Sequence, residues 1–306
     1  MAKFKKIANI ALIILAYGYL GYKIATYDNY PGLLAQFQAA GVWQWLCLAG
    51  CFLLFPVNRL CEAWKWQYLV RDIEPMNIWE AQRQVYYGTL AGFVTPYKLG
   101  EYPGRALLFR NTQQHWLTAT CLGMIGGYAM TTVIIVFGLP AVVFWLAPDS
   151  SLLWSIALAL VGAVAAVIAL PALMRRLQGR SWKSEQSRLL VDNMAQLTIS
   201  DVCILLIMSL LRYAVFIVQL QLTLLFCSVK LDALSTIITL PLYYLLITVT
   251  PNVPAAELAV RGAWAAVIFE RFGSDITAAA VIASILLWSI NTIFPLLVGS
   301  AMRRLH

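Results

Sequence analysis

One stretch organises this sequence: Thr95-Pro96-Tyr97-Lys98-Leu99-Gly100-Glu101-Tyr102-Pro103-Gly104-Arg105. It lies in a very apolar region, yet it carries three charges, two prolines and two glycines. A related stretch starts 155 residues later: Thr250-Pro251-Asn252-Val253-Pro254-Ala255-Ala256-Glu257-Leu258-Ala259-Val260-Arg261. Prolines interrupt a helix because they remove a hydrogen-bond donor and clash with the preceding turn. Interrupted hydrophobic segments at matching places in two halves of a membrane chain indicate a transporter's binding site.

The composition is that of a membrane protein. The chain has 306 residues, of which 61% are hydrophobic and 12% charged, and its mean hydropathy is +0.75. A soluble domain carries about 25% charged residues, and several apolar runs here are long enough to cross a bilayer. The net charge of +8 is explained by cytoplasmic loops and anionic lipid headgroups, so we expect no nucleic-acid partner. The six cysteines are expected to be small buried hydrophobic residues.

The apolar runs predict an all-α polytopic membrane protein with about six full transmembrane helices and two re-entrant helical hairpins. The expected spans are 7–22, 42–60, 117–138, 152–170, 202–226 and 278–299. The hairpins cover about 84–109 and 234–269, with breaks at Pro96 and Gly100 and at Pro251 and Pro254. We expect the segment from Arg59 to Arg83 to lie at the cytoplasmic face, and 140–150 to form an external loop.

Basic residues set the expected orientation. Lysines near the start, the arginine-rich loop after 170 and the arginines at the end place both termini in the cytoplasm. The first hairpin then enters from the cytoplasm and the second from outside, which makes the two halves inverted repeats. We expect one integral membrane domain over 1–306, with a first repeat at about 41–139, a connecting helix and basic loop at 151–200, and a second repeat at 201–300.

The charges of the two stretches predict an anion site. Glu101 and Arg105, like Glu257 and Arg261, are four residues apart, which puts each pair on one face of a helix. A local ion pair is the alternative explanation, but charges are costly in a membrane and more often mark function. Arginine holds phosphate bidentately, and backbone N–H groups after each break add donors. The expected substrate-binding residues are Arg105, Arg261, Glu101, Glu257, Lys98, Arg212, Thr95 and Thr250.

Other charged residues receive more specific expectations. Lys98 either contributes to the anion site or is a surface lysine that extends toward water. Arg212 lies well inside its span, which favours a role in the cavity or an ion pair with a hairpin glutamate. Arg59 is expected to act as a positive charge at a cytoplasmic helix end, and Glu62 and Asp201 to lie at the membrane interface.

At Thr95, Pro96, Gly100, Glu101 and Arg105 the sequence resembles the lysylphosphatidylglycerol synthase transmembrane (flippase-like) domain family. The second stretch matches less closely, because it lacks the expected glycines and its Glu precedes its Arg. The resemblance covers most of the chain and implies movement of a charged or phosphate-bearing lipid between leaflets. Some relatives carry a soluble aminoacyl-transferase domain, and none is expected here.

The sequence therefore favours a lipid flippase or translocase for a phospholipid or a polyprenyl-phosphate-linked lipid, in a bacterial cytoplasmic membrane. Its expected partners are anionic or phosphate-bearing membrane lipids. The sequence leaves the oligomeric state open, and a homo-oligomer is one of the options. We expect no catalytic residues, metal site or cofactor, and no enzyme activity. Two alternatives remain: a membrane-embedded transferase or its subunit acting on a lipid-linked substrate, and a small-solute or ion transporter.

Overall fold

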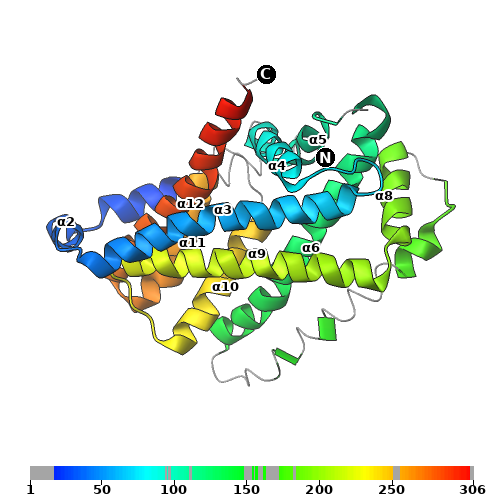
Figure 1. Ribbon diagram of the computed structural model, residues 1–306. Coiled ribbons are helices and arrows are strands. Elements are labelled where there is room, and N and C mark those ends of the chain that lie inside the picture. The colour runs from blue at the N-terminus through cyan, green and yellow to red at the C-terminus, as the bar shows by residue number, and fades with distance from the viewer. Residues whose placement is uncertain are drawn as a thin grey trace.

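A computed structural model describes residues 17–93, 95, 98–109, 112–147, 154, 156–157, 161–162, 172–181, 184–250 and 256–303. This part of the chain is helical and contains no strand (Figure 1). After a first helix at 17–25, the labelled helices are α2 (Tyr30–Gln38), α3 (Val42–Val70), α4 (Ile78–Phe93), α5 (Glu101–Ala106), α6 (Thr112–Leu146), α8 (Glu185–Gln196), α9 (Ile199–Phe226), α10 (Ala233–Val249), α11 (Glu257–Phe269), the 3₁₀ helix η3 (Glu270–Phe272) and α12 (Ser274–Arg303).

In the described part of the chain, four helices are long and apolar enough to cross a membrane: α3, α6 over His115–Leu146, α9, and α12 over Ser274–Leu297. They coincide with four of the six predicted spans. The other two, at 7–22 and 152–170, fall mostly outside the described residues. These four apolar helices indicate an integral membrane protein, as the composition predicted.

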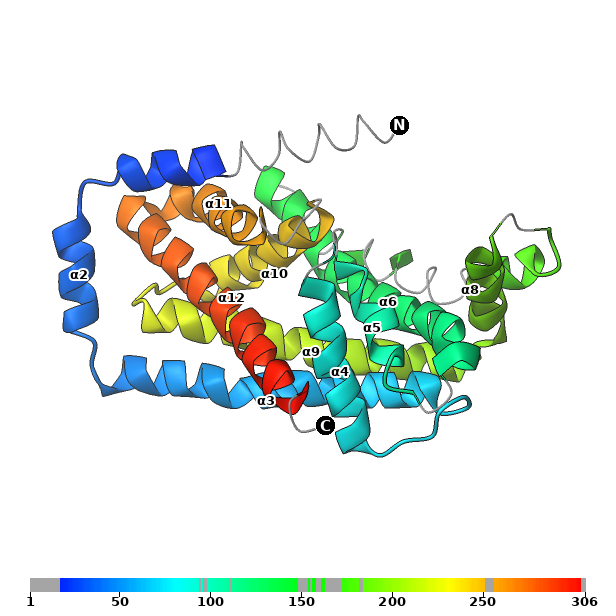
Figure 2. The same cartoon turned by 90° about the horizontal axis from the view of Figure 1, so that it is seen from above.

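The long helices form the frame on which the short ones pack. In Figure 1, α3 and α9 lie side by side as two long rods, and α12 crosses them in Figure 2. The short helix α4 packs against α12, which is distant from it in sequence, and α10 packs against α6. One short helix of each half, α4 and α10, thereby packs against a long helix of the other half.

Three predicted boundaries are wrong. The helix that starts at Val42 does not end near residue 60 but continues to Val70, because its charged residues pair with other charges inside the protein. The expected external loop from 140 is helical, since α6 continues through Pro140 to Leu146; membrane helices tolerate proline where neighbouring groups satisfy the freed backbone. The expected half-span at 99–109 shortens to the six residues of α5.

Glycine allows α4 and α5 to approach closely. A Cβ atom at Gly88 would lie 2.6 Å from the Glu101 carbonyl oxygen, and one at Gly104 would lie 2.5 Å from the Ala91 side chain. Such distances leave no room for a methyl group, so only glycine fits at these two positions. The close approach brings the Arg105 side chain against α4 and directs it into the interior.

Candidate functional site

Glu62 of α3 is the centre of a buried charged cluster. Arg105 Nη2 donates to Glu62 Oε1 at 2.8 Å, while Arg212 Nη1 and Lys65 Nζ bind Glu62 Oε2 at 2.5 and 3.0 Å. Arg105 Nη2 also reaches Glu101 Oε1 at 2.5 Å. We call these five residues the Glu62 cluster. Three helices, α3, α5 and α9, supply its side chains, and Glu62 is only 4% exposed.

A second group of charges joins the two halves of the chain. Glu257, which is 1% exposed, accepts from Arg261 at 3.2 Å and from Lys98 at 2.9 Å. Arg261 follows Glu257 by one helical turn of α11, whereas Lys98 comes from the first motif. We call these three residues the Glu257 cluster. It brings the charged residues of the two motifs into direct contact across 159 positions of sequence.

Lys98 adopts an unusual backbone conformation where it makes this contact. Its φ is +55°, a left-handed value that costs a residue with a side chain about 1–2 kcal/mol. The Lys98 side chain is 41% exposed, while its partner Glu257 is buried. The strained turn therefore presents a partly accessible cation to a buried carboxylate of the other motif.

The two clusters and the neighbouring Arg59 hold more positive than negative charge. Arg59 is buried, and it donates to the backbone oxygen of Asn291 at 2.5 Å and to Thr89 Oγ1 at 3.4 Å. It makes no ion pair with a carboxylate of the described residues. With Arg59 added, the two clusters comprise six cations and three carboxylates, an excess of three positive charges: Arg59, Lys65, Lys98, Arg105, Arg212 and Arg261 against Glu62, Glu101 and Glu257.

Several buried donors at these clusters have no hydrogen-bond partner in the described part of the chain. They are the Nε atoms of Arg59 and Arg105 and the Nδ2 atom of Asn58. Asn58 is fully buried, and its Oδ1 accepts from Arg212 Nε at 3.2 Å. Buried donors are normally satisfied, and these three outnumber the one buried cluster acceptor without a partner in the described residues, Glu257 Oε2.

The two predicted threonines stabilise the motifs themselves. The Thr95 hydroxyl donates toward the Ala91 and Gly92 carbonyl oxygens and accepts from Gly100 N at 2.8 Å. The Thr250 hydroxyl donates to the carbonyl oxygen four residues earlier at 2.6 Å and accepts from the indole of Trp264 at 2.8 Å. In both motifs the hydroxyl therefore connects the end of one helix to the segment after the break.

Within each motif the structure shows the ion pair that the sequence offered as the alternative explanation, Glu101–Arg105 and Glu257–Arg261. Two expectations, for Arg212 and Lys98, are corrected. Arg212 pairs with Glu62 of α3 and not with a hairpin glutamate. Lys98 is tied to Glu257, so it is not a simple surface lysine. Among the breaks, Gly100 precedes α5, and Pro96, Pro251 and Pro254 lie outside the described residues.

Sequence reasoning missed the role of α3. Arg59 was expected at a cytoplasmic helix end and Glu62 at the membrane interface. Both lie within α3 instead, and their side chains are buried in the protein. Lys65 of the same helix is 2% exposed. The signal was present in the spacing, because Arg59, Glu62 and Lys65 are three residues apart and so share one helix face. Asp201, also expected at the interface, accepts from Tyr68 at 2.6 Å and from Arg71 at 3.0 Å.

Nothing in the described part of the chain resembles a metal centre, since no three His, Cys, Asp or Glu side chains group closely enough to hold a metal ion. Compared with known families and curated proteins, the sequence matches no family model and no curated protein.

Proposed function

We propose that this protein moves an anionic, phosphate-bearing lipid between the leaflets of a bacterial cytoplasmic membrane. The headgroup would bind between the Glu62 and Glu257 clusters while the lipid tails stay in the bilayer. The activity is transport and not catalysis. The resemblance of the first motif to the flippase-like domain family agrees with this proposal.

The observation that carries the proposal is the excess of positive charge in the two clusters together with Arg59. Transferring an ion from water to a protein interior costs several kcal/mol even after relaxation. Three carboxylates shared among six cations, with Arg59 paired to no carboxylate of the described residues, therefore favour the binding of a mobile anion. Phosphate oxygens are suitable acceptors for the free Nε groups of Arg59 and Arg105 because charge-assisted hydrogen bonds to guanidinium are strong.

We further propose that the two halves are inverted repeats and that α4/α5 and α10/α11 are re-entrant hairpins. Matching lengths support this, with 29 and 28 residues in α3 and α9 and 16 and 17 residues in α4 and α10. The packing of α4 on α12 corresponds to that of α10 on α6 under exchange of the halves. The equivalent hydroxyl contacts of Thr95 and Thr250 support the same relation.

Repeats of this kind transport by rocking one unit against the other around a central site. The Lys98–Glu257 ion pair connects the two hairpins directly, so such a motion must stretch or exchange it. In our proposal a lipid phosphate binds Arg261 and Lys98 in place of Glu257, which releases the hairpins from each other. The proposal thus connects headgroup binding to movement through one ion pair.

A flipping assay with purified full-length protein tests the proposal. The chain is reconstituted into liposomes containing phosphatidylglycerol with a fluorescent acyl chain, and the inner-leaflet label becomes accessible to an added quencher only if the lipid crosses. The assay is run with and without a proton gradient, so that it detects both energised and passive flipping. We expect Arg261→Gln, and the charge-balanced double variant Arg105→Gln with Glu101→Gln, to abolish the added flipping.

Arg271→Gln is the matched control, because Arg271 lies in η3 and stacks on Trp145, away from both clusters. It should flip lipid at the wild-type rate. Unchanged flipping in the folded cluster variants would refute the assigned site. Transport of soluble phosphate without any lipid flipping would refute the lipid proposal and favour a solute transporter.

A further inference from the structure

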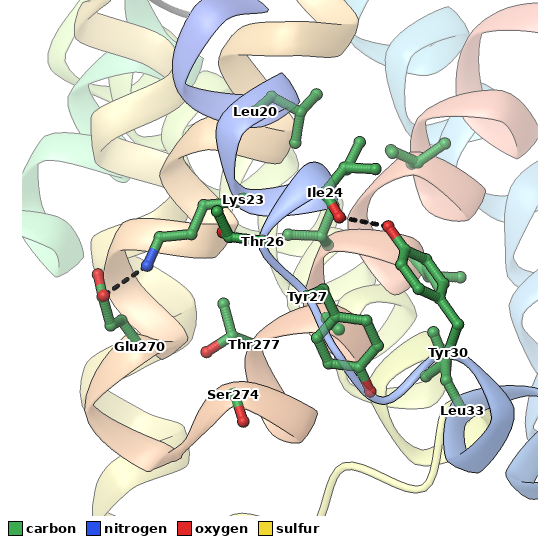
Figure 3. Close-up of a pocket in the computed structure, with 14 residues that line it drawn as sticks. Leu20, Lys23, Ile24, Thr26, Tyr27, Tyr30, Leu33, Glu270, Ser274 and Thr277 are labelled. Atoms are coloured by element: carbon green, nitrogen blue, oxygen red, sulfur yellow. Dashed lines mark hydrogen bonds and ion pairs between the residues drawn. The ribbon is translucent and has the colours of Figure 1, made fainter.

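A cleft of about 530 Å³ lies between the helix 17–25, α2, η3 and α12 (Figure 3). Its volume is within the range of roughly 300–1,000 Å³ typical of small-molecule sites. Side chains such as Leu20, Ile24, Val281, Ile282 and Ile285 make most of its wall apolar. None of the residues of the Glu62 and Glu257 clusters lines it, so it is a separate site.

One end of the cleft carries a pair of opposite charges. Lys23 Nζ and Glu270 Oε1 are 2.5 Å apart, and their side chains are 25% and 57% exposed. The hydrogen bond from Lys23 lowers the pKa of Glu270, and the same bond raises the pKa of Lys23. Both groups are therefore charged at neutral pH and remain accessible at the mouth of the cleft.

Hydroxyl groups and tyrosine rings complete this polar end. Figure 3 shows Ser274 and Thr277 of α12 below the Lys23–Glu270 pair, with Tyr27 and Tyr30 on the opposite side. Tyrosine is enriched at the level of lipid headgroups because its ring is apolar and its hydroxyl is polar. The cleft thus has an apolar wall along a membrane-spanning helix and a dipolar, hydroxyl-rich end.

We propose that this cleft binds one zwitterionic phospholipid of the phosphatidylethanolamine type. An acyl chain lies along α12, the lipid phosphate accepts from Lys23, and the lipid ammonium donates to Glu270. Adjacent opposite charges complement a headgroup that also carries one charge of each sign. An anionic headgroup would have no cation for Glu270, and the methyl groups of a choline cannot donate to this carboxylate.

Such a lipid would link parts of the chain that are distant in sequence. The helix 17–25 and α2 lie along the same edge of the molecule as the start of α12 in Figure 2, and the cleft separates them. A bound acyl chain fills this apolar space, and the headgroup connects Lys23 to Glu270. Binding therefore stabilises the attachment of the helix 17–25 to η3 and α12.

Photocrosslinking of the full chain in nanodiscs tests the site. The probe is phosphatidylethanolamine with a diazirine in one acyl chain, and peptide mass spectrometry locates the adducts. We expect labelling of α12 around Val281–Ile285 that excess unlabelled phosphatidylethanolamine suppresses better than phosphatidylcholine or phosphatidylglycerol. Ala278→Phe fills the cleft and should remove this labelling, whereas the control Val267→Phe, on an exposed face of α11, should not.

Glu270→Gln tests the headgroup contact without filling the cleft. It should lower the preference for phosphatidylethanolamine over phosphatidylglycerol about tenfold, because one charge-assisted hydrogen bond is lost. Absence of adducts on α12, equal suppression by all three lipids, or an unchanged preference in Glu270→Gln would overturn the proposal. These results do not bear on flipping, because the two sites share no residue.

Discussion

Glu62 binds three cationic side chains with its two carboxylate oxygens. Oε1 accepts from Arg105, and Oε2 lies beside Arg212 and Lys65. A single carboxylate, at the point where α3, α5 and α9 meet, therefore supplies the negative charge that these three cations share. Because its neighbours are buried as well, water cannot replace it.

We predict that Glu62→Gln strongly destabilises the fold. The substitution leaves Lys65, Arg105 and Arg212 without their shared counter-ion, and breaking a buried ion pair costs about 3–5 kcal/mol. Thermal unfolding in detergent should show a lowered midpoint. The control Glu185→Gln, at the exposed start of α8, should change stability by only a few tenths of a kcal/mol. Equal midpoints for the two variants would contradict this role of Glu62.

The packing of α4 on α5 depends on the absence of side chains. Gly88 faces both the Arg105 side chain and the Glu101 carbonyl oxygen, so α5 can approach α4 as closely as backbone contact allows. This close approach positions Arg105 between Glu62 and Glu101. The geometry of one helix pair thereby controls the arrangement of the Glu62 cluster.

Gly88→Ala should separate the two helices. The new methyl group would meet the Glu101 backbone oxygen, which cannot rotate away, and overpacking of this kind costs about 1–3 kcal/mol. We expect a lower unfolding midpoint together with loss of flipping. Gly21→Ala is the matched control, because a Cβ atom there meets nothing within 4 Å, and alanine in a helix is favoured by roughly 0.5–1 kcal/mol. An unchanged unfolding midpoint and unchanged flipping in Gly88→Ala would contradict this close packing of α4 on α5.

The helix 17–25 is attached to the rest of the molecule by polar contacts at its C-terminal end and in the segment that follows. Lys23 binds Glu270, and Asp275 accepts from the Tyr27 hydroxyl at 3.1 Å and from Asn29 Nδ2 at 3.2 Å. Burial and the hydrogen bond to Asp275 raise the pKa of Tyr27 to about 12. This hydroxyl therefore stays protonated and keeps donating across the physiological range.

The attachment should weaken in acid. Lys23 holds the folded-state pKa of Glu270 below its unfolded value of about 4.3. Its stabilising contribution is fully present above that unfolded value and is lost as pH falls through the lowered folded value. Hydrogen exchange of residues 17–27, corrected for intrinsic rates, should accelerate as the pH falls below about 4.3. Glu270→Gln should show a smaller change; an identical change would assign the effect to groups other than Glu270.

Much of the architecture follows from sequence pattern. Apolar runs predicted α3, α6, α9 and α12, because a span in lipid must be apolar over its length. The spacing of Glu101 and Arg105, and of Glu257 and Arg261, predicted that each pair shares one helix face, because residues four apart meet on a helix whatever surrounds it. These features are local, so one helix contains all the information they need.

Sequence pattern alone could not predict which helices, distant in sequence, contact each other in the fold. The sequence alone established a helical membrane protein with two charged, interrupted motifs. Tertiary structure made Glu62 the shared counter-ion of three cations and joined Lys98 to Glu257 across 159 positions. The physical reason is that a buried charge is satisfied by whichever helix packs beside it, and that neighbour is set by the packing of the whole molecule.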